Sequence, residues 1–125
     1  MIGGLVGKKV LVVDDSVTIR QQLRMALTPA GYEVIEAFDG EDGLAKAKAD
    51  PDLAMAICDV NMPRMDGIEM ITKMREYGLT LPIVMLTTEG QPGLIKRAKA
   101  AGAKGWIVKP FNATLLVKAV DKLAI

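Results

Sequence analysis

The chain is predicted to fold as an α/β domain of the (βα)5 type, a doubly wound sandwich built on a five-stranded parallel sheet. Short apolar runs alternate about five times with amphipathic stretches of helical periodicity. No repeat or low-complexity linker interrupts this alternation. At 125 residues the chain has the size of one common domain. Strands separated by helices of this length imply right-handed βαβ units and a mostly parallel sheet.

Five segments are predicted to be strands. Four are uninterrupted apolar runs, the pattern of parallel strands buried on both faces, and one alternates weakly between polar and apolar residues. In chain order the predicted strands are Val10–Val13, Glu33–Phe38, Ala54–Cys58, Ile83–Leu86 and Trp106–Val108.

Five amphipathic stretches between and after these strands are predicted to be helices. They are expected to begin at Ser16 as N-cap, Asp39-Gly40, Asp66-Gly67, Gln91, and Asn112 as N-cap. The first should end at Pro29-Ala30-Gly31 and the second near Asp50-Pro51. The apolar side chains predicted to face inward are Ile19, Leu23, Ala26, Leu27, Leu44, Ala47, Ile68, Ile71, Met74, Leu94, Ile95, Ala98, Leu115, Leu116, Ala119, Val120 and Leu123.

Polar residues end four of the predicted strands. Asp14 and Asp15 follow the first strand, and Asp59 follows the third. Thr87 follows the fourth strand and Lys109 the fifth. Because the carboxyl ends of parallel strands share one edge of the sheet, where open α/β folds bind ligands, we expect these side chains to converge.

Clustered carboxylates predict a cation site. Two like charges about 4 Å apart repel by roughly 4 kcal/mol at an effective dielectric constant of about 20. A divalent cation removes this repulsion, and an all-oxygen site suits Mg²⁺ or Mn²⁺. Asp14, Asp15 and Asp59 are the predicted side-chain ligands, and the backbone carbonyl of Asn61 is predicted to join them. The alternative for Asp14 and Asp15 is that they only stabilise a helix N-terminus.

The same edge predicts phosphoryl chemistry. Asp59 stands at the tip of a central strand and can act as a nucleophile that forms an aspartyl phosphate. Lys109 supplies a positive charge that can hold a phosphate, and Thr87 offers a hydroxyl to a phosphoryl oxygen. These three residues are therefore the predicted catalytic groups.

Four motifs resemble those of the receiver domains of two-component response regulators. They are Val12-Val13-Asp14-Asp15-Ser16, Asp59 to Gly67, Thr87-Thr88-Glu89 and Lys109-Pro110-Phe111. Each motif alone is weak, but their order and spacing match over essentially the full length. The resemblance implies a flavodoxin-like receiver fold, phosphorylation of Asp59 by a histidine kinase, and Mg²⁺ held by Asp14 and Asp15. It also implies a cis peptide bond between Lys109 and Pro110.

The resemblance implies further roles. Thr87 and Trp106 are expected to switch together on phosphorylation, although tyrosine or phenylalanine is more usual at the position of Trp106. Asn61 and Glu89 lie where the family tunes hydrolysis of the phosphoryl group. The fourth helix, fifth strand and fifth helix form the output face in this family.

The part of the chain that would form this output face is basic. From Lys96 to the end, seven basic residues stand against one acidic residue, a net charge of +6. Lys99 and Lys122 are therefore expected to attract an acidic partner segment by electrostatic steering. The alternative is that these lysines are ordinary solvated side chains.

The predicted function is that of a phosphoacceptor switch and not of an enzyme acting on other substrates. Thr87-Thr88-Glu89 and Gly102 to Trp106 are similar to stand-alone chemotaxis regulators. Because the chain ends directly after the fifth helix, a motor switch or another output protein is the expected partner, with a phosphatase as a further one. A phosphorelay intermediate and an excised receiver stay open as alternatives. A different class, an Mg²⁺-dependent phosphohydrolase with an aspartyl-phosphate nucleophile, would need a substrate cap, and no inter-strand segment is long enough to form one.

The composition of the sequence excludes several classes of function. A net charge of +1 predicts neither nucleic-acid nor membrane binding, and the lack of histidine excludes histidine-based catalysis or metal binding. No apolar run approaches the roughly 20 residues that span a bilayer. The lone Cys58 suits a reducing compartment and is predicted to be a buried apolar residue. We expect a cytoplasmic monomer with a flexible N-terminal lead over residues 1–7 and a single receiver domain over residues 8–125.

Overall fold

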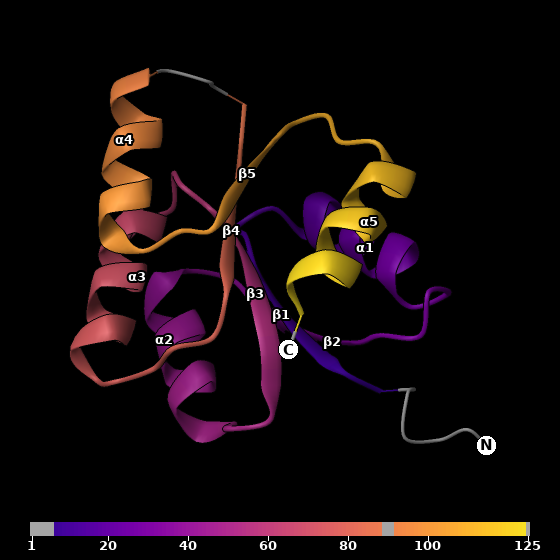
Figure 1. The fold of residues 1–125 in the computed structure, drawn as a ribbon, viewed down its shortest axis with the longest axis horizontal. Coiled ribbons are helices and arrows are strands. Elements are labelled where there is room, and N and C mark those ends of the chain that lie inside the picture. Colours follow the sequence, from indigo (N-terminus) through magenta and orange to yellow (C-terminus); the bar gives the residue numbers. More distant parts are fainter. Residues whose placement is uncertain (1–6, 89–91, 125) are drawn as a thin grey trace.

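Five parallel strands form the centre of the molecule, in the spatial order β2-β1-β3-β4-β5 (Figure 1). The computed structural model describes residues 7–88 and 92–124. The strands are β1 Lys9–Val13, β2 Glu33–Ala37, β3 Leu53–Asp59, β4 Ile83–Thr87 and β5 Gly105–Val108. The predicted doubly wound parallel sheet is therefore confirmed. The observed strand ends either agree with the predicted ones or differ from them by one residue.

Helices cover both faces of this sheet. They are α1 Val17–Leu27, α2 Gly40–Ala49, α3 Gly67–Glu76, α4 Pro92–Ala101 and α5 Ala113–Leu123. Figure 1 shows α2, α3 and α4 on one face and α1 and α5 on the other. Each face has its own core, one centred on α3 with β3 and β4, the other between the sheet and the α1–α5 pair. The central strand β3 is buried along its whole length, which fits its apolar sequence.

The predicted helix starts are confirmed by capping hydrogen bonds. The side chains of Ser16, Asp39, Asp66 and Asn112 each accept a hydrogen bond from the backbone N–H three residues on. Such a bond satisfies one of the free N–H groups of the first helical turn. The predicted start of the fourth helix at Gln91 lies outside the described residues.

One inward-facing prediction is wrong. Leu115 of α5 is 64% exposed, while Leu116 and Val120 on the same helix are buried. Adjacent residues of a helix point about 100° apart, so Leu115 and Leu116 cannot both face the sheet.

The N-terminal lead is only partly described. Residues 1–6 of the predicted lead lie outside the described residues, and the N–H of Gly7 donates to the carbonyl of Gly31 at 2.9 Å. Among the helices the structure describes, none is long and apolar enough to cross a bilayer.

Candidate functional site

The sheet register brings the predicted site residues to one edge. Asp59 is the last residue of β3 and pairs with Leu86 of β4. Asp14 follows β1, whose last residue pairs with Cys58, so Asp14 and Asp59 end neighbouring strands. Thr87 ends β4 and pairs with Val108 of β5, and Lys109 comes next in the chain. These residues therefore share the carboxyl edge of the sheet, as their positions after the strands predicted.

Three carboxylates gather at this edge. Oxygen atoms of Asp14, Asp15 and Asp59 all lie within 4.8 Å of one another. Asp14 is fully buried and Asp59 is 6% exposed, whereas Asp15 is exposed to solvent. Like charges at such distances, two of them out of water, raise the free energy of the ionised state.

The side chain of Lys109 offsets part of this repulsion. Lys109 Nζ lies 3.1 Å from Asp14 Oδ2 and 3.4 Å from Asp59 Oδ1. Burial by itself lowers the pKa of the Lys109 ammonium, but the two carboxylates outweigh burial and leave this pKa above its usual value. The backbone N–H of Lys109 donates to the carbonyl of Thr87 at 2.7 Å, which fixes the base of the lysine side chain.

The carboxyl of Asp59 is held in a poorly solvated place. Burial raises its pKa most, the charge of Asp14 raises it further, and Lys109 lowers it, so that the pKa of Asp59 stands at about 6. Asp59 is therefore largely ionised at neutral pH, at the cost of repulsion from Asp14.

The donor set fits a hard divalent cation. Asp14 Oδ1 accepts a hydrogen bond from the Ser16 N–H at 2.9 Å. Asp14 Oδ2 is buried, and although Lys109 is near, no hydrogen bond of acceptable geometry reaches this atom from the residues the structure describes. A buried carboxylate oxygen that accepts no hydrogen bond, together with two further carboxylates, makes an all-oxygen site of the kind that Mg²⁺ or Mn²⁺ prefers.

A network that the sequence did not reveal supports Asp14. The Arg20 guanidinium donates to the backbone carbonyl of Asp14 at 2.6 Å and to Glu36 Oε1 at 3.0 Å. Arg24 holds the other oxygen of Glu36 at 2.8 Å. Burial tends to raise the pKa of Glu36, but hydrogen bonds from Arg24 and Arg20 leave this pKa lowered. The helical periodicity places Arg20 away from the sheet and gives no signal for this contact.

The remaining predicted residues differ in how deeply they are buried. Thr87 is fully buried, and Asn61 is exposed two residues after Asp59. Trp106 is half-buried and packs against the core on the α3 face. The peptide bond between Lys109 and Pro110 is cis. Glu89 lies outside the described residues.

Cys58 is fully buried and packs near Met70, with 3.9 Å between the two sulfur atoms. Burial raises the pKa of the Cys58 thiol well above its usual value, and the charges of nearby aspartates add to this effect. The thiol therefore stays protonated, and the predicted reading of Cys58 as a buried apolar residue is confirmed.

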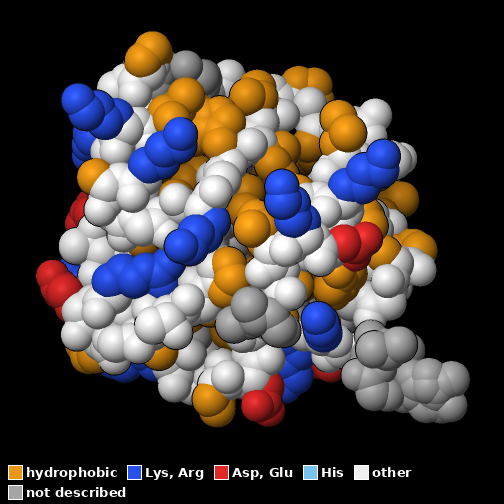
Figure 2. All heavy atoms as spheres, in the orientation of Figure 1, with side chains coloured by type: hydrophobic (Ala, Val, Ile, Leu, Met, Phe, Trp, Pro, Cys, Tyr) orange, Lys and Arg blue, Asp and Glu red, His pale blue; other side chains and the backbone are white. Residues whose placement is uncertain are grey.

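A groove of about 430 Å³ lies between β5 and α5. Trp106, the exposed Val108 and the exposed Leu115 line it. Figure 2 shows lysine and arginine side chains over α4 and over α5, with hydrophobic side chains between them. This combination of an apolar groove and a basic surround is a surface suited to protein contact.

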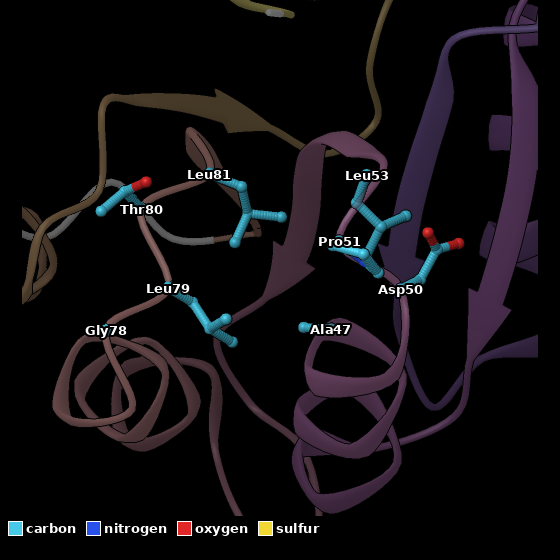
Figure 3. Close-up of a pocket in the computed structure, with 8 residues that line it drawn as sticks. All are labelled: Ala47, Asp50, Pro51, Leu53, Gly78, Leu79, Thr80 and Leu81. Carbon is cyan, nitrogen blue, oxygen red and sulfur yellow. The ribbon is translucent and has the colours of Figure 1, made fainter.

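A smaller cleft of about 210 Å³ lies at the opposite end of the sheet, between the end of α2 and the segment before β4 (Figure 3). Among the described residues that line it, Asp50 is the ionisable one, and its carboxylate pairs with Lys9 at 3.1 Å. The cleft therefore offers no group for the chemistry gathered at the carboxyl edge.

Comparisons with known proteins agree with this geometry. A family model described as the response regulator receiver domain matches residues 10–121. The chain is 42% identical over 106 residues to the chemotaxis protein CheY of Treponema pallidum, covering 83% of this chain and 74% of that protein. The solved structure of chemotaxis protein CheY4 of Vibrio cholerae is 45% identical with a TM-score of 0.88, covering 94% of this chain and 99% of that one.

A third similarity is to the CheX-CheY-BeF3-Mg²⁺ complex of Borrelia burgdorferi. The matched chain is 33% identical with a TM-score of 0.88, covering 94% of this chain and 89% of that one. These solved structures confirm the flavodoxin-like fold.

Proposed function

The chain belongs to the response regulator receiver family of two-component systems, and from this premise we propose that Asp59 is its phosphoacceptor and that the protein acts in chemotaxis control. One observation carries the assignment of Asp59. Its carboxylate stands at the tip of the central strand, 3.4 Å from Lys109 Nζ and within 4.8 Å of two further carboxylates. Similarity to named chemotaxis proteins over most of the chain supports the biological role.

The proposed reaction is transfer of a phosphoryl group from a histidine kinase. An Asp59 carboxylate oxygen forms a bond to phosphorus, while the bond between phosphorus and the donor's histidine nitrogen breaks. The electron pair of that bond stays on the nitrogen, which then takes up a proton. Lys109 and the Thr87 hydroxyl would contact the phosphoryl oxygens, where charge accumulates in the transition state.

A divalent cation belongs to this proposal. Asp14, Asp15 and Asp59 would hold it, together with the backbone carbonyl of Asn61. Bound Mg²⁺ supplies charge neutralisation at the phosphoryl oxygens. The buried Asp14 Oδ2, which pairs with Lys109 but accepts no hydrogen bond from the described residues, supports this assignment, and so does the Mg²⁺ named in the Borrelia complex.

The output of the switch is proposed to be protein binding. Thr87 and Trp106 would couple phosphorylation to the groove between β5 and α5, because Thr87 ends β4 and Trp106 both pairs with β4 and lines that groove. Asn61 and Glu89 would set the lifetime of the phosphoryl group. The expected partners are a histidine kinase, a motor switch protein contacted near Lys99 and Lys122, and a phosphatase.

We also propose that the protein works in the cytoplasm as a monomer. A reducing compartment keeps the single thiol of Cys58 unpaired. The complex of CheX with CheY in Borrelia supports the idea that a relative of this kind binds a separate protein.

The first test uses the fluorescence of Trp106, the one tryptophan in the sequence. The native protein and Asp59→Asn are titrated with Mg²⁺ and then with beryllofluoride, a phosphoryl mimic. We expect a beryllofluoride response that requires Mg²⁺ and is absent in Asp59→Asn. Mass spectrometry after acetyl phosphate treatment should show one phosphoryl adduct, retained in the loop variant Asp52→Asn. No adduct on the native chain would overturn the proposal, and sustained turnover of phosphate monoesters would favour a phosphohydrolase instead.

A further inference from the structure

Arg64, in the loop between β3 and α3, has an unusual backbone conformation. Its φ angle is 68°, in the left-handed region where the Cβ of any residue other than glycine crowds the backbone. The turn around Arg64 is tight, since the N–H of Met65 donates to the carbonyl of Pro63 at 2.8 Å. Such strained residues persist only where surrounding contacts hold them, and they are common at functional sites.

The side chain of Arg64 supplies the holding contact. Its Nε donates to Asp39 Oδ2 at 2.9 Å. The Asp39 side chain is 3% exposed, and its Oδ1 accepts the Asp42 N–H at 2.8 Å to cap α2. A buried carboxylate is costly without a partner, and within the described part of the chain Arg64 is the cation that forms an ion pair with Asp39. The pair therefore ties the tip of the loop to the start of α2.

The loop is held at its base as well. The N–H of Gly67 donates to the carbonyl of Val60 at 2.9 Å, which closes residues 61–66 into a short loop. The start of α2 also presses against it, because a Cβ on Gly40 would lie 2.3 Å from the carbonyl oxygen of Met65. The loop is therefore fixed both at its base and at its tip, and Asn61 lies three residues before Arg64 within it.

We propose that Arg64 and Asp39 are positioning residues for the phosphoacceptor site. Their ion pair holds the 61–66 loop so that Asn61, two residues after Asp59, presents its backbone correctly to the divalent cation. Neither residue contacts the reacting atoms. The inference deepens the proposed function and rests on it, since it presupposes a cation at Asp59. Breaking the pair then weakens binding of the cation in the unphosphorylated protein, before any chemistry occurs.

The test measures Mg²⁺ affinity by NMR titration of backbone amides in full-length variants. Arg64→Asn removes the pair, and asparagine tolerates a positive φ, so the turn is preserved. Asp39→Asn removes the charge but keeps a good helix cap. Loss of a contact that supports a ligand typically costs 10–100-fold in metal affinity, so each variant should bind Mg²⁺ roughly 10-fold more weakly. The double variant should bind no more weakly than either single one, because both break the same contact.

Lys9→Gln is the matched control. It removes the ion pair with Asp50, 3.1 Å long, at the far end of the sheet. We expect Lys9→Gln to bind Mg²⁺ with wild-type affinity, even if urea unfolding shows that this variant is less stable. The proposal would be overturned if Arg64→Asn bound Mg²⁺ with wild-type affinity. It would also be overturned if the losses of affinity multiplied in the double variant, or if Lys9→Gln lost as much Mg²⁺ affinity. If Arg64→Asn does not fold, Asp39→Asn decides alone. Failure of the proposed function is distinct, because it would appear as no Mg²⁺ binding in the native protein.

Discussion

The ammonium nitrogen of Lys109 lies 3.4 Å from Oδ1 of Asp59, although β4 separates β3, which Asp59 ends, from β5, which Lys109 follows. The lysine side chain therefore reaches across the end of one strand to meet the carboxylate of the central strand. In the unphosphorylated protein this contact compensates negative charge on the carboxylates. On phosphorylation the same ammonium would face the oxygens of the transferred group, so one cation serves both states.

Removing the positive charge of Lys109 should affect phosphoryl transfer and Mg²⁺ binding differently. In Lys109→Gln we expect acetyl phosphate labelling of Asp59 to slow by roughly 100-fold, the usual cost of losing a transition-state donor. Mg²⁺ affinity should be kept or increased, because a competing cation has left the carboxylates. Mass spectrometry over time and an NMR titration measure the two effects. Lys104→Gln, at an exposed lysine just before β5, is the control; equal labelling rates in both variants would refute the role of Lys109.

The raised pKa of Asp59 predicts a pH-dependent cost in stability. Its carboxyl has a pKa of about 6 in the folded protein, against an ordinary value of 3.8. Between these values the folded state binds more protons than the unfolded state, so stability falls as pH rises through this window. Above pH 6 the whole penalty is present, on the order of 2 kcal/mol after discounting for solvent screening of the exposed part.

Asp59→Asn should therefore stabilise the metal-free protein. In EDTA at pH 7.5 we expect its free energy of unfolding, measured with urea, to exceed that of the native chain by about 1–2 kcal/mol. The gain should shrink as pH falls through 6 and vanish below about 3.8. Asp52→Asn, at an exposed loop position, should show no such trend. A gain that is independent of pH would mean that charge repulsion is not its cause.

Much of the fold was predictable because its signals are local. The caps Ser16, Asp39, Asp66 and Asn112 act on an N–H only three residues away, so their role can be recognised in a short window of sequence. The convergence of Asp14, Asp59 and Lys109 was predictable for another reason. Parallel strands all direct their carboxyl ends to one edge, so strand order did not have to be known.

Contacts between distant side chains were not predictable in this way. Nothing in the sequence marks Arg64 as the partner of Asp39, 25 positions earlier, or Arg20 as a donor to the carbonyl of Asp14. Leu115 was wrongly assigned to the core because the apolar arc of α5 is wider than the face that the sheet can cover. Which part of a wide arc stays exposed depends on packing, and here the exposed part borders the groove.

Gly67→Ala should disturb the site through the backbone. A Cβ at Gly67 would lie 2.3 Å from the carbonyl oxygen of Asp59, so the start of α3 or the end of β3 must move. We expect a loss of about 1–3 kcal/mol in the free energy of unfolding, as for other overpacked sites, together with weaker Mg²⁺ binding. Gly93→Ala is the control, because its Cβ meets no atom of the described residues within 4 Å and alanine is the better helix former. Similar stabilities of the two variants would contradict the close approach.

The basic surround of the groove predicts how an output partner is recognised. Lys99 on α4 and Lys122 on α5 are exposed, and Lys122 lies seven positions after Leu115, on the same face of α5. Lys99→Glu combined with Lys122→Glu should weaken binding of the beryllofluoride-treated protein to a motor switch protein by roughly 10-fold at low salt, and less at high salt. Acetyl phosphate labelling should be unchanged, since neither lysine is part of the site. Calorimetric titration measures the affinity of this double variant and of each single one, with Lys73→Glu on α3 as the charge reversal that matches the single variants on another surface. If Lys73→Glu weakens binding as much, the partner responds to total charge and not to this face; if neither change matters, the groove alone must supply the recognition.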